Sequence, residues 1–252
     1  MNLSEQQLTA YARDGYLFFP SLFSADEMAR VRAATDRLLH EASGPEVYRE
    51  ESGAVRLMYD VDRRAPEFDE LLRSPRLVNT AEQLLGEPSY LYQSRLNPKF
   101  GFTGGPWPWH QDFGAWARED GMPEPRCVMV AVFVDEVTAA NGPLLVVPGS
   151  QRHGLVDAQL TEGKKGDFVV MEIDGTTLAK LADDGGIDAL IGPPGSVAFI
   201  QCNLVHASAP NLTPWRRALQ YFMYNAISNT PAKRARPRFL CSDDFTPLVA
   251  SA

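Results

Sequence analysis

The chain has 252 residues, of which 44% are hydrophobic and 22% are charged, and its formal net charge is −8. These values are typical of a globular protein with a proper core, and they argue against an intrinsically disordered chain. The acidic balance also argues against binding to nucleic acid, which depends on clustered Lys and Arg.

The first 88 residues are predicted to form a helical N-terminal part. Two residue pairs have the spacing of capping boxes, in which a serine and a residue three positions later satisfy each other's backbone N–H groups at the start of a helix. These pairs are Ser4 with Gln7 and Ser24 with Glu27. The second pair predicts a helix over about residues 25–41, and a further helix is expected over about residues 66–85. Residues 15–20 form a short apolar run that is typical of a buried strand.

From residue 89 to residue 230, short apolar segments alternate with turns rich in Gly, Pro and Asn. The expected strands are residues 90–96, 107–113, 127–134, 144–147, 196–201 and 218–225. Helices followed by many short strands indicate a mainly β fold with flanking helices. We expect a double-stranded β-helix core of the jelly-roll or cupin type, with the N-terminal helices packed on it.

Residues 151–192 interrupt this strand pattern and are too long for a hairpin loop. Long insertions in compact domains are often functional, so this segment is either a lid over a site or a plain surface excursion. Near the other end of the core, a basic run contains Lys233, Arg234, Arg236 and Arg238. We expect this run to be a solvated segment near the C-terminus rather than a nucleic-acid site.

The length suits one domain, residues 1–252, because β-sandwiches and barrels routinely reach this size. The cysteines, Cys127, Cys202 and Cys241, are widely spaced and odd in number, which favours reduced thiols over a disulfide framework. The sequence shows no signal-peptide pattern, and no window approaches the roughly 18 apolar residues of a membrane span. We therefore expect a cytoplasmic protein without membrane contact.

His110 and Asp112 stand two positions apart in a segment predicted to be a strand. Because alternate side chains on a strand point to the same face, these two can reach one point in space. One further histidine would complete two imidazoles and one carboxylate, which is the ligand set of non-heme Fe(II) oxygenases. Alone, the pattern favours a packed histidine that bonds to a neighbour, and the metal site becomes the better interpretation only in combination with a suitably placed later histidine and arginine.

His206 is the strongest candidate for the third ligand, because it follows a predicted strand late in the barrel. Of the other histidines, His153 lies in a polar turn and His40 lies at a helix end, where its charge would complement the helix dipole. Arg217 comes eleven residues after His206, on the next predicted strand. A buried arginine needs a partner, and a dicarboxylate would suit its two-point guanidinium fork.

The residues around these positions resemble the phytanoyl-CoA dioxygenase superfamily of Fe(II)- and 2-oxoglutarate-dependent oxygenases, and within it the ectoine hydroxylase branch. The resemblance covers nearly the whole chain and is carried by residues 14–17, 93–97, 109–123, 141–150 and 224–229. It implies one dioxygenase domain in which His110, Asp112 and His206 bind Fe(II) and Arg217 binds the far carboxylate of 2-oxoglutarate.

The same resemblance implies that Asn97 and Ser208 assist 2-oxoglutarate, and that Gln93, Trp107 and Trp116 line a substrate pocket. For the two tryptophans, core packing is an equal alternative, since aromatic residues dominate cores as well as sites.

The implied reaction uses O2 and 2-oxoglutarate to hydroxylate a small, polar, amino-acid-like or natural-product substrate, with release of succinate and CO2. Desaturation, cyclisation and epimerisation use the same ligands and stay open. Halogenation is disfavoured, because family halogenases lack the carboxylate ligand that Asp112 would provide. Two other classes are a cupin-like Zn or Mn enzyme, which leaves Arg217 unexplained, and a non-catalytic jelly-roll binding module. The sequence does not indicate an oligomeric state.

The segment after the His-x-Asp pair departs from the branch it resembles. Ectoine hydroxylases typically have Glu, Thr and His where this chain has Gly114, Ala115 and Ala117. Loss of these polar groups argues against ectoine itself as the substrate. An acyl-CoA is also disfavoured, because no basic residues near this block mark a site for nucleotide phosphates.

Overall fold

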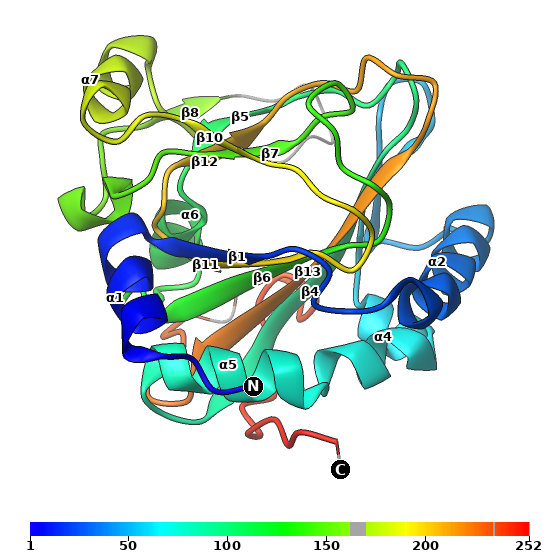
Figure 1. The fold of residues 1–252 in the computed structure, drawn as a ribbon, viewed down its shortest axis with the longest axis horizontal. Helices are drawn as coiled ribbons and strands as arrows, with labels where there is room; N and C mark the ends of the chain where they lie inside the picture. Colours follow the sequence, from blue (N-terminus) through cyan, green and yellow to red (C-terminus); the bar gives the residue numbers. More distant parts are fainter. Residues whose placement is uncertain (162–169, 234, 252) are drawn as a thin grey trace.

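Two antiparallel β-sheets face each other in the computed structural model, which describes residues 1–161, 170–233 and 235–251 (Figure 1). The larger sheet has the strand order β1-β11-β6-β13-β4-β3-β2, and the smaller has the order β10-β7-β12-β5. This architecture confirms the predicted mainly β fold with a jelly-roll core and flanking helices.

The bounds of the strands are as follows. The larger sheet contains β1 (Tyr16–Phe19), β2 (Val47–Arg49), β3 (Val55–Tyr59), β4 (Ser89–Lys99), β6 (Cys127–Phe133), β11 (Val197–Gln201) and β13 (Arg217–Ala226). The smaller sheet contains β5 (Trp107–His110), β7 (Leu144–Val146), β10 (Asp188–Leu190) and β12 (His206–Ser208). A separate hairpin pairs β8 (Gln159–Thr161) with β9 (Val170–Glu172).

Most of the helices lie on the N-terminal side of the sequence, and α5 packs across β4, β6 and β13 on the outer face of the larger sheet (Figure 1). The helices are α1 (Glu5–Asp14), α2 (Ala25–His40), α3 (Val61–Arg64), α4 (Pro66–Leu72), α5 (Pro75–Leu85), α6 (Asp112–Glu119) and α7 (Gly175–Gly185), with a short 3-10 helix, η1 (Ser150–His153). Both predicted capping boxes are present, at the starts of α1 and α2.

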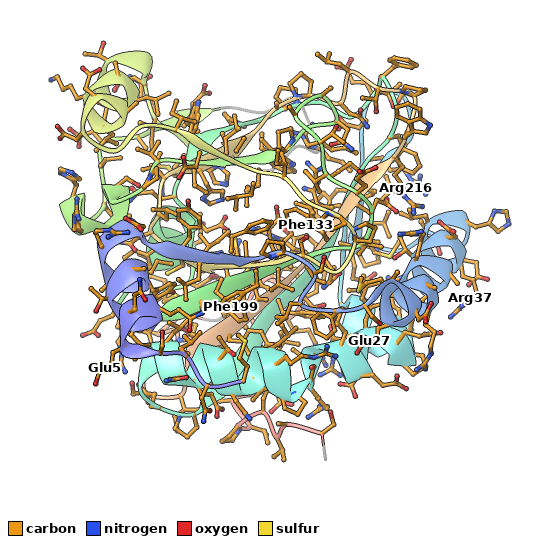
Figure 2. The ribbon with its side chains drawn as sticks, viewed as in Figure 1. Glu5, Glu27, Arg37, Phe133, Phe199 and Arg216 are labelled. Carbon is orange, nitrogen blue, oxygen red and sulfur yellow. The ribbon has the colours of Figure 1, made fainter. Side chains whose placement is uncertain are left out.

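Two apolar cores result from this layering. Phe199 belongs to the core between the larger sheet and the helices, and Phe133 belongs to the core between the two sheets (Figure 2). Strand β13 is buried along its whole length because alternate residues supply the two cores, with Phe222 facing the helices and Leu219 facing the smaller sheet. A strand covered on both faces has few places for charge, which makes the buried Arg217 conspicuous.

The N-terminal part, predicted as helices with one strand, contributes three strands, β1, β2 and β3, to the larger sheet. The apolar run at residues 15–20 does contain the predicted strand, β1. The helix predicted over residues 66–85 is in fact two helices, α4 and α5. Pro75 causes the break, because proline has no N–H to donate and forces the preceding Ser74 out of helical geometry.

The strand predicted over residues 107–113 ends at His110. Gln111 has extended backbone angles and caps the next helix, so Asp112 is the first residue of α6 rather than a strand residue. The two candidate ligands therefore lie on different elements that a one-residue junction connects.

The described parts of residues 151–192 contain η1, the β8–β9 hairpin and α7, and the segment then supplies β10 to the smaller sheet. Residues 162–169 of this insertion lie outside the described residues. Strand β9 lies against β5 and α6, and the N–H of Ile173 donates to the carbonyl of Trp109 over 2.8 Å. Among the described helices, none is long and apolar enough to cross a membrane.

We predict that Gly195→Ala destabilises the fold by more than about 2 kcal/mol, because L-residues pay for left-handed backbone and a steric clash adds to that cost. Gly195 has φ +87°, and an added Cβ would lie 2.1 Å from the carbonyl oxygen of Phe23. Gly53→Ala is the control, since Gly53 has a similar φ of +84° with no atom within 4 Å of the added Cβ. Thermal and denaturant unfolding should show a clearly larger loss for Gly195→Ala; equal losses would contradict the clash.

Candidate metal centre

Three potential metal ligands, His110, Asp112 and His206, meet beside the space between the two sheets. One ligand atom of each lies within 4.8 Å of those of the others. The Nε2 atom of His110 is 3.6 Å from Oδ1 of Asp112, and the Nε2 atom of His206 is 3.9 Å from Oδ2. No other such group of three or more occurs among the residues that the structure describes. Two imidazoles and one carboxylate that can bind one face of a metal ion form a facial triad.

The backbone brings the triad together from three elements. His110 ends β5 and His206 begins β12, and these two residues are direct partners in the antiparallel pairing of the two strands. Asp112 arrives through the turn into α6, where the N–H of Phe113 donates to the carbonyl of Cys202 over 2.9 Å. The predicted convergence of His110 and Asp112 is therefore present, but strand alternation is the wrong explanation for it.

Both imidazoles are oriented by backbone carbonyls. Nδ1 of His110 is 2.7 Å from the carbonyl oxygen of Pro108, and Nδ1 of His206 is 2.9 Å from that of Leu204. Since a carbonyl oxygen only accepts, each Nδ1 carries a proton, and each Nε2 is the ring nitrogen that faces the carboxylate of Asp112. Burial, followed by the nearby His110, lowers the pKa of His206 to about 3, so this ring is neutral at physiological pH.

Asp112 remains ionised although it is buried. Burial by itself raises the pKa of this carboxyl group, but the guanidinium of Arg95 and the two histidines outweigh burial, and the net pKa is far below its usual range. Nη2 of Arg95 donates to Oδ2 of Asp112 over 2.6 Å. The centre thus presents two imidazole nitrogens and one anionic carboxylate oxygen, a donor set that suits a divalent transition metal.

Arg217 is 1% exposed and has no carboxylate partner among the described residues. Its Nη2 donates to the carbonyl of Gly142 over 2.5 Å, and its Nε has no partner. Burial lowers its pKa to about 10. The buried Oγ of Ser208 and Oδ1 of Asn97 also lack hydrogen-bond partners. Unsatisfied buried polar groups are costly, and their concentration here fits a polar ligand that brings its own acceptors and an anionic end.

Lys99 is a second buried basic residue beside Arg217, and the sequence analysis missed it. The two residues are direct partners in the pairing of β4 with β13. Nζ of Lys99 donates to the carbonyls of Gly105 and Ala209. Burial, with a smaller contribution from Arg217, lowers its pKa to about 6.

A pocket that opens to solvent lies against the triad, with a volume of about 100 Å³ available to the centres of water molecules. It brings together all three triad residues and the predicted Gln93, Asn97, Trp107, Trp116 and Ser208. Arg217 is not part of the lining. The pocket also has lining residues that the sequence analysis did not identify, among them Leu57, Tyr59, Arg95, Gln111, Ala115, Leu144, Met171, Tyr221 and Arg236.

The predicted pocket aromatics have two roles at once. Trp116 lines the pocket but is also 3% exposed and packs edge-on against Tyr92, with ring centroids 5.0 Å apart. Core packing and pocket lining are thus not alternatives for this residue. Trp107 has the guanidinium of Arg56 4.2 Å from its ring centroid. Gln93 donates to the carbonyl of Leu240, and its Oε1 has no partner.

Arg236 corrects the prediction of a solvated basic run. Its Nε donates to Oδ1 of Asp120 over 2.7 Å, and Asp120 is completely buried. A buried carboxylate without a counter-charge is costly. Arg236 supplies that counter-charge to Asp120, and it therefore lies in the pocket wall rather than in solvent. Lys233 instead bonds to the carbonyl of Arg118, while Arg234 lies outside the described residues. The only signal in the sequence was the basic run itself, because its acidic partner is more than a hundred residues away.

Gln111, between the two ligands His110 and Asp112, fastens this segment to its surroundings. Its Nε2 donates to the carbonyls of Gly154 and Asn203 over 2.8 and 2.6 Å, and its Oε1 accepts from the N–H of Val156 over 3.0 Å. Both amide N–H groups and the amide oxygen are therefore engaged. The junction between β5 and α6 is held from the side of η1 and β12.

Comparisons with known proteins agree with this geometry. A sequence profile described as phytanoyl-CoA dioxygenase (PhyH) matches residues 11–219. The L-proline trans-4-hydroxylase of Streptomyces griseoviridis is 39% identical over 256 residues, which cover 95% of this chain and 92% of that protein. The ectoine dioxygenase of Bordetella parapertussis is 39% identical over 242 residues, which cover 90% of this chain and 77% of that protein.

Solved structures are similar in fold. EctD from S. alaskensis with bound Fe has a TM-score of 0.87 and 36% identity, covering 99% of this chain and 87% of that chain. The same protein with 2-oxoglutarate and 5-hydroxyectoine has a TM-score of 0.86 and 35% identity, with the same coverage. The α-ketoglutarate-dependent carbocyclase SnoK from nogalamycin biosynthesis shares the fold at 22% identity, with a TM-score of 0.76, covering 98% of this chain and 97% of that chain.

We predict that Gln111→Leu weakens Fe(II) binding by roughly 10-fold or more, because loss of a group that orients metal ligands typically costs 10–100-fold in affinity. Anaerobic titration with Fe(II) measures this. Gln83→Leu is the matched control, since Gln83 also exchanges two hydrogen bonds with a backbone, that of Leu3, far from the site. The control should lower thermal stability and leave Fe(II) affinity unchanged; unchanged affinity in Gln111→Leu would disprove its positioning role.

Proposed function

This chain belongs to the phytanoyl-CoA dioxygenase family, and we propose that it hydroxylates a small free amino acid, with cyclic imino acids such as L-proline as the preferred class. It is an Fe(II)- and 2-oxoglutarate-dependent dioxygenase that uses O2. When bound, iron with 2-oxoglutarate and dioxygen supplies the oxidising power that converts a C–H bond to C–OH, releasing succinate and CO2. The observation that carries the assignment is the buried triad beside an arginine without an anionic partner.

We assign the iron to His110, Asp112 and His206. Three facts support this assignment: the two Nε2 atoms that face Asp112, the ionised carboxylate, and the absence of a second such cluster among the described residues. Arg95 pairs with Oδ2 of Asp112, but the Nε2 atoms of both histidines and Oδ1 of Asp112 face one another with no cation between them, and a bound metal would satisfy all three.

We assign the far carboxylate of 2-oxoglutarate to Arg217, with Ser208 and Asn97 beside it. An incoming carboxylate would provide the guanidinium with the acceptor that it lacks, and the hydroxyl of Ser208 can donate to the same ligand. Exclusion of water by the surrounding core strengthens this ion pair, since charges attract more strongly where the dielectric constant is low.

The pocket wall supports a zwitterionic substrate. Arg236 contributes a cation that suits a carboxylate, while Trp107, Trp116 and the unpartnered Oε1 of Gln93 suit an ammonium or imino group. Orientation by these groups determines which C–H bond faces the triad.

The residues after the His-x-Asp pair favour an imino acid over ectoine. Ala115 contributes only a methyl group to the pocket lining, and a Cβ on Gly114 would meet only Leu155, at 3.6 Å. Ala117 packs against the core between the sheets. This wall therefore lacks the polar groups that ectoine hydroxylases typically have there. The relatives of this chain also include a proline hydroxylase that aligns with it over 92% of that protein's length.

Two further expectations belong to this proposal. The part of the insertion around β9 acts as a lid over the pocket, an inference supported by Met171 in the pocket lining and by the hydrogen bond between Ile173 and Trp109. The enzyme works in the cytoplasm, which is consistent with its three cysteines being unpaired.

We predict that anaerobic Fe(II) and 2-oxoglutarate give a weak visible charge-transfer band that Asp112→Ala abolishes. Arg217→Ala should raise the 2-oxoglutarate concentration that half-saturates this band by about 30-fold or more, because truncating one partner of a buried charge pair costs about 2–5 kcal/mol. Arg216→Gln is the control: Arg216 points away from the site and pairs with Asp135 and Asp36 near α2 (Figure 2). Absence of the band in the wild-type protein would rule out the assigned cofactors.

We predict that L-proline or a related cyclic imino acid stimulates succinate release more strongly than ectoine does. The readouts are substrate-dependent succinate and product mass, where a gain of one oxygen atom indicates hydroxylation and a loss of two hydrogens indicates desaturation or cyclisation. A preference for ectoine would overturn the imino-acid proposal while keeping the chemistry. A response to thioester-bound or carrier-bound substrates alone would overturn the free amino acid proposal.

A further inference from the structure

Arg95 is a charged residue inside the pocket that neither the sequence analysis nor the proposed function has used. It lies on β4 between Gln93 and Asn97, and all three side chains line the pocket, as alternate residues on one strand face do. Its Nη2 is 2.6 Å from Oδ2 of Asp112. Within the described part of the chain, it is the one guanidinium paired with this carboxylate.

The guanidinium is held in place by the larger sheet. Its cross-strand partner on β13 is Tyr221, whose ring centroid lies 5.2 Å from Cζ of Arg95. Its Nη2 also approaches the sulfur of Met129 on β6 at 3.6 Å. Residues from three adjacent strands thus fix the direction from which Arg95 reaches Asp112.

We propose that Arg95 is a positioning residue that limits Asp112 to binding the metal through one oxygen atom. The guanidinium engages Oδ2, which leaves Oδ1 as the free donor on the side of His110. This inference rests on the proposed function, since it needs a metal at the triad.

The chemistry explains why one oxygen matters. A carboxylate binds a metal through one or both oxygens, and the second oxygen would take one more coordination position. A cosubstrate that chelates through two atoms and a dioxygen molecule together need three positions beyond the triad. By engaging one oxygen of Asp112, Arg95 keeps the third position free.

This role predicts a split that simple structural support would not produce. Arg95 brings a positive charge towards a divalent cation, so its removal relieves a repulsion, and the metal itself then supplies the counter-charge that the buried Asp112 needs. Freed from Arg95, both oxygens of Asp112 turn to the metal, and the cosubstrate loses a position. Metal affinity should therefore hold or rise while 2-oxoglutarate affinity falls.

The test uses Arg95→Met in the full-length protein, under anaerobic conditions. Calorimetric titration with Mn(II) measures metal affinity, and the charge-transfer band with Fe(II) measures 2-oxoglutarate affinity. We expect Mn(II) affinity equal to or tighter than that of the wild type and 2-oxoglutarate binding weaker by roughly 10-fold or more, the usual scale for a residue that orients metal ligands. Arg95→Lys, which keeps a donor and a charge on a different stem, should show the same split with a smaller loss.

Two results would overturn the inference. Parallel weakening of Mn(II) and 2-oxoglutarate binding would mean that Arg95 only supports the fold around Asp112, and no change in either would mean that it has no role. If the methionine variant does not fold, the same readouts on Arg95→Lys decide. Arg64→Met, which breaks the partly buried ion pair with Glu46 at 2.7 Å, is the control for loss of an ion pair and should change neither affinity.

The outcomes also separate this inference from the proposed function. A wild-type protein that binds no metal or gives no band refutes the proposed function. A wild-type band that Arg95→Met and Arg95→Lys leave untouched refutes the positioning role alone.

Discussion

The ionised carboxylate of Asp112, buried between two sheets, is the constraint on which the rest of the site depends. A charge at that depth is tolerated only with a counter-charge and directed hydrogen bonds, and Arg95 supplies both from the facing strand. The imidazole of His206 adds no positive charge of its own, because burial lowers its pKa to about 3, and carbonyls orient both imidazoles through Nδ1. The jelly roll serves this arrangement by bringing β4, β5 and β12 to one place.

Local sequence signals were sufficient for the main features of this protein. Turn residues and short apolar runs indicated the β fold, and the spacing of His110, Asp112, His206 and Arg217 indicated the chemistry. The error over Asp112 was also local: a carboxylate two residues after a histidine looks the same on a strand and at the first turn of a helix. Pro75 was a visible signal for a helix break, but the prediction of one helix over residues 66–85 did not take it into account.

Residues whose role depends on a distant partner could not be found in this way. Arg95 pairs with Asp112 and Arg236 pairs with Asp120, across 17 and 116 positions of the chain. Nothing in the neighbourhood of either arginine distinguishes it from a solvated one. Lys99 is a similar case, since only the pairing of β4 with β13 places it beside Arg217. The fold decides which residue partners a buried charge, and the local sequence around one residue does not show which distant residue this will be.

The C-terminal segment after β13 has an evolutionary consequence. Through Arg236 it forms part of the pocket wall, while the iron-binding and 2-oxoglutarate-binding residues that we assign all belong to the strands, and to the first residue of α6, before or within β13. Arg236 and the residues after Asp112 are thus separate in sequence from the residues that we assign to iron and 2-oxoglutarate, whereas Gln93 and Trp107 share β4 and β5 with them. Substitutions in the C-terminal segment or after Asp112 can therefore reshape one wall of the pocket without replacing a triad residue or Arg217.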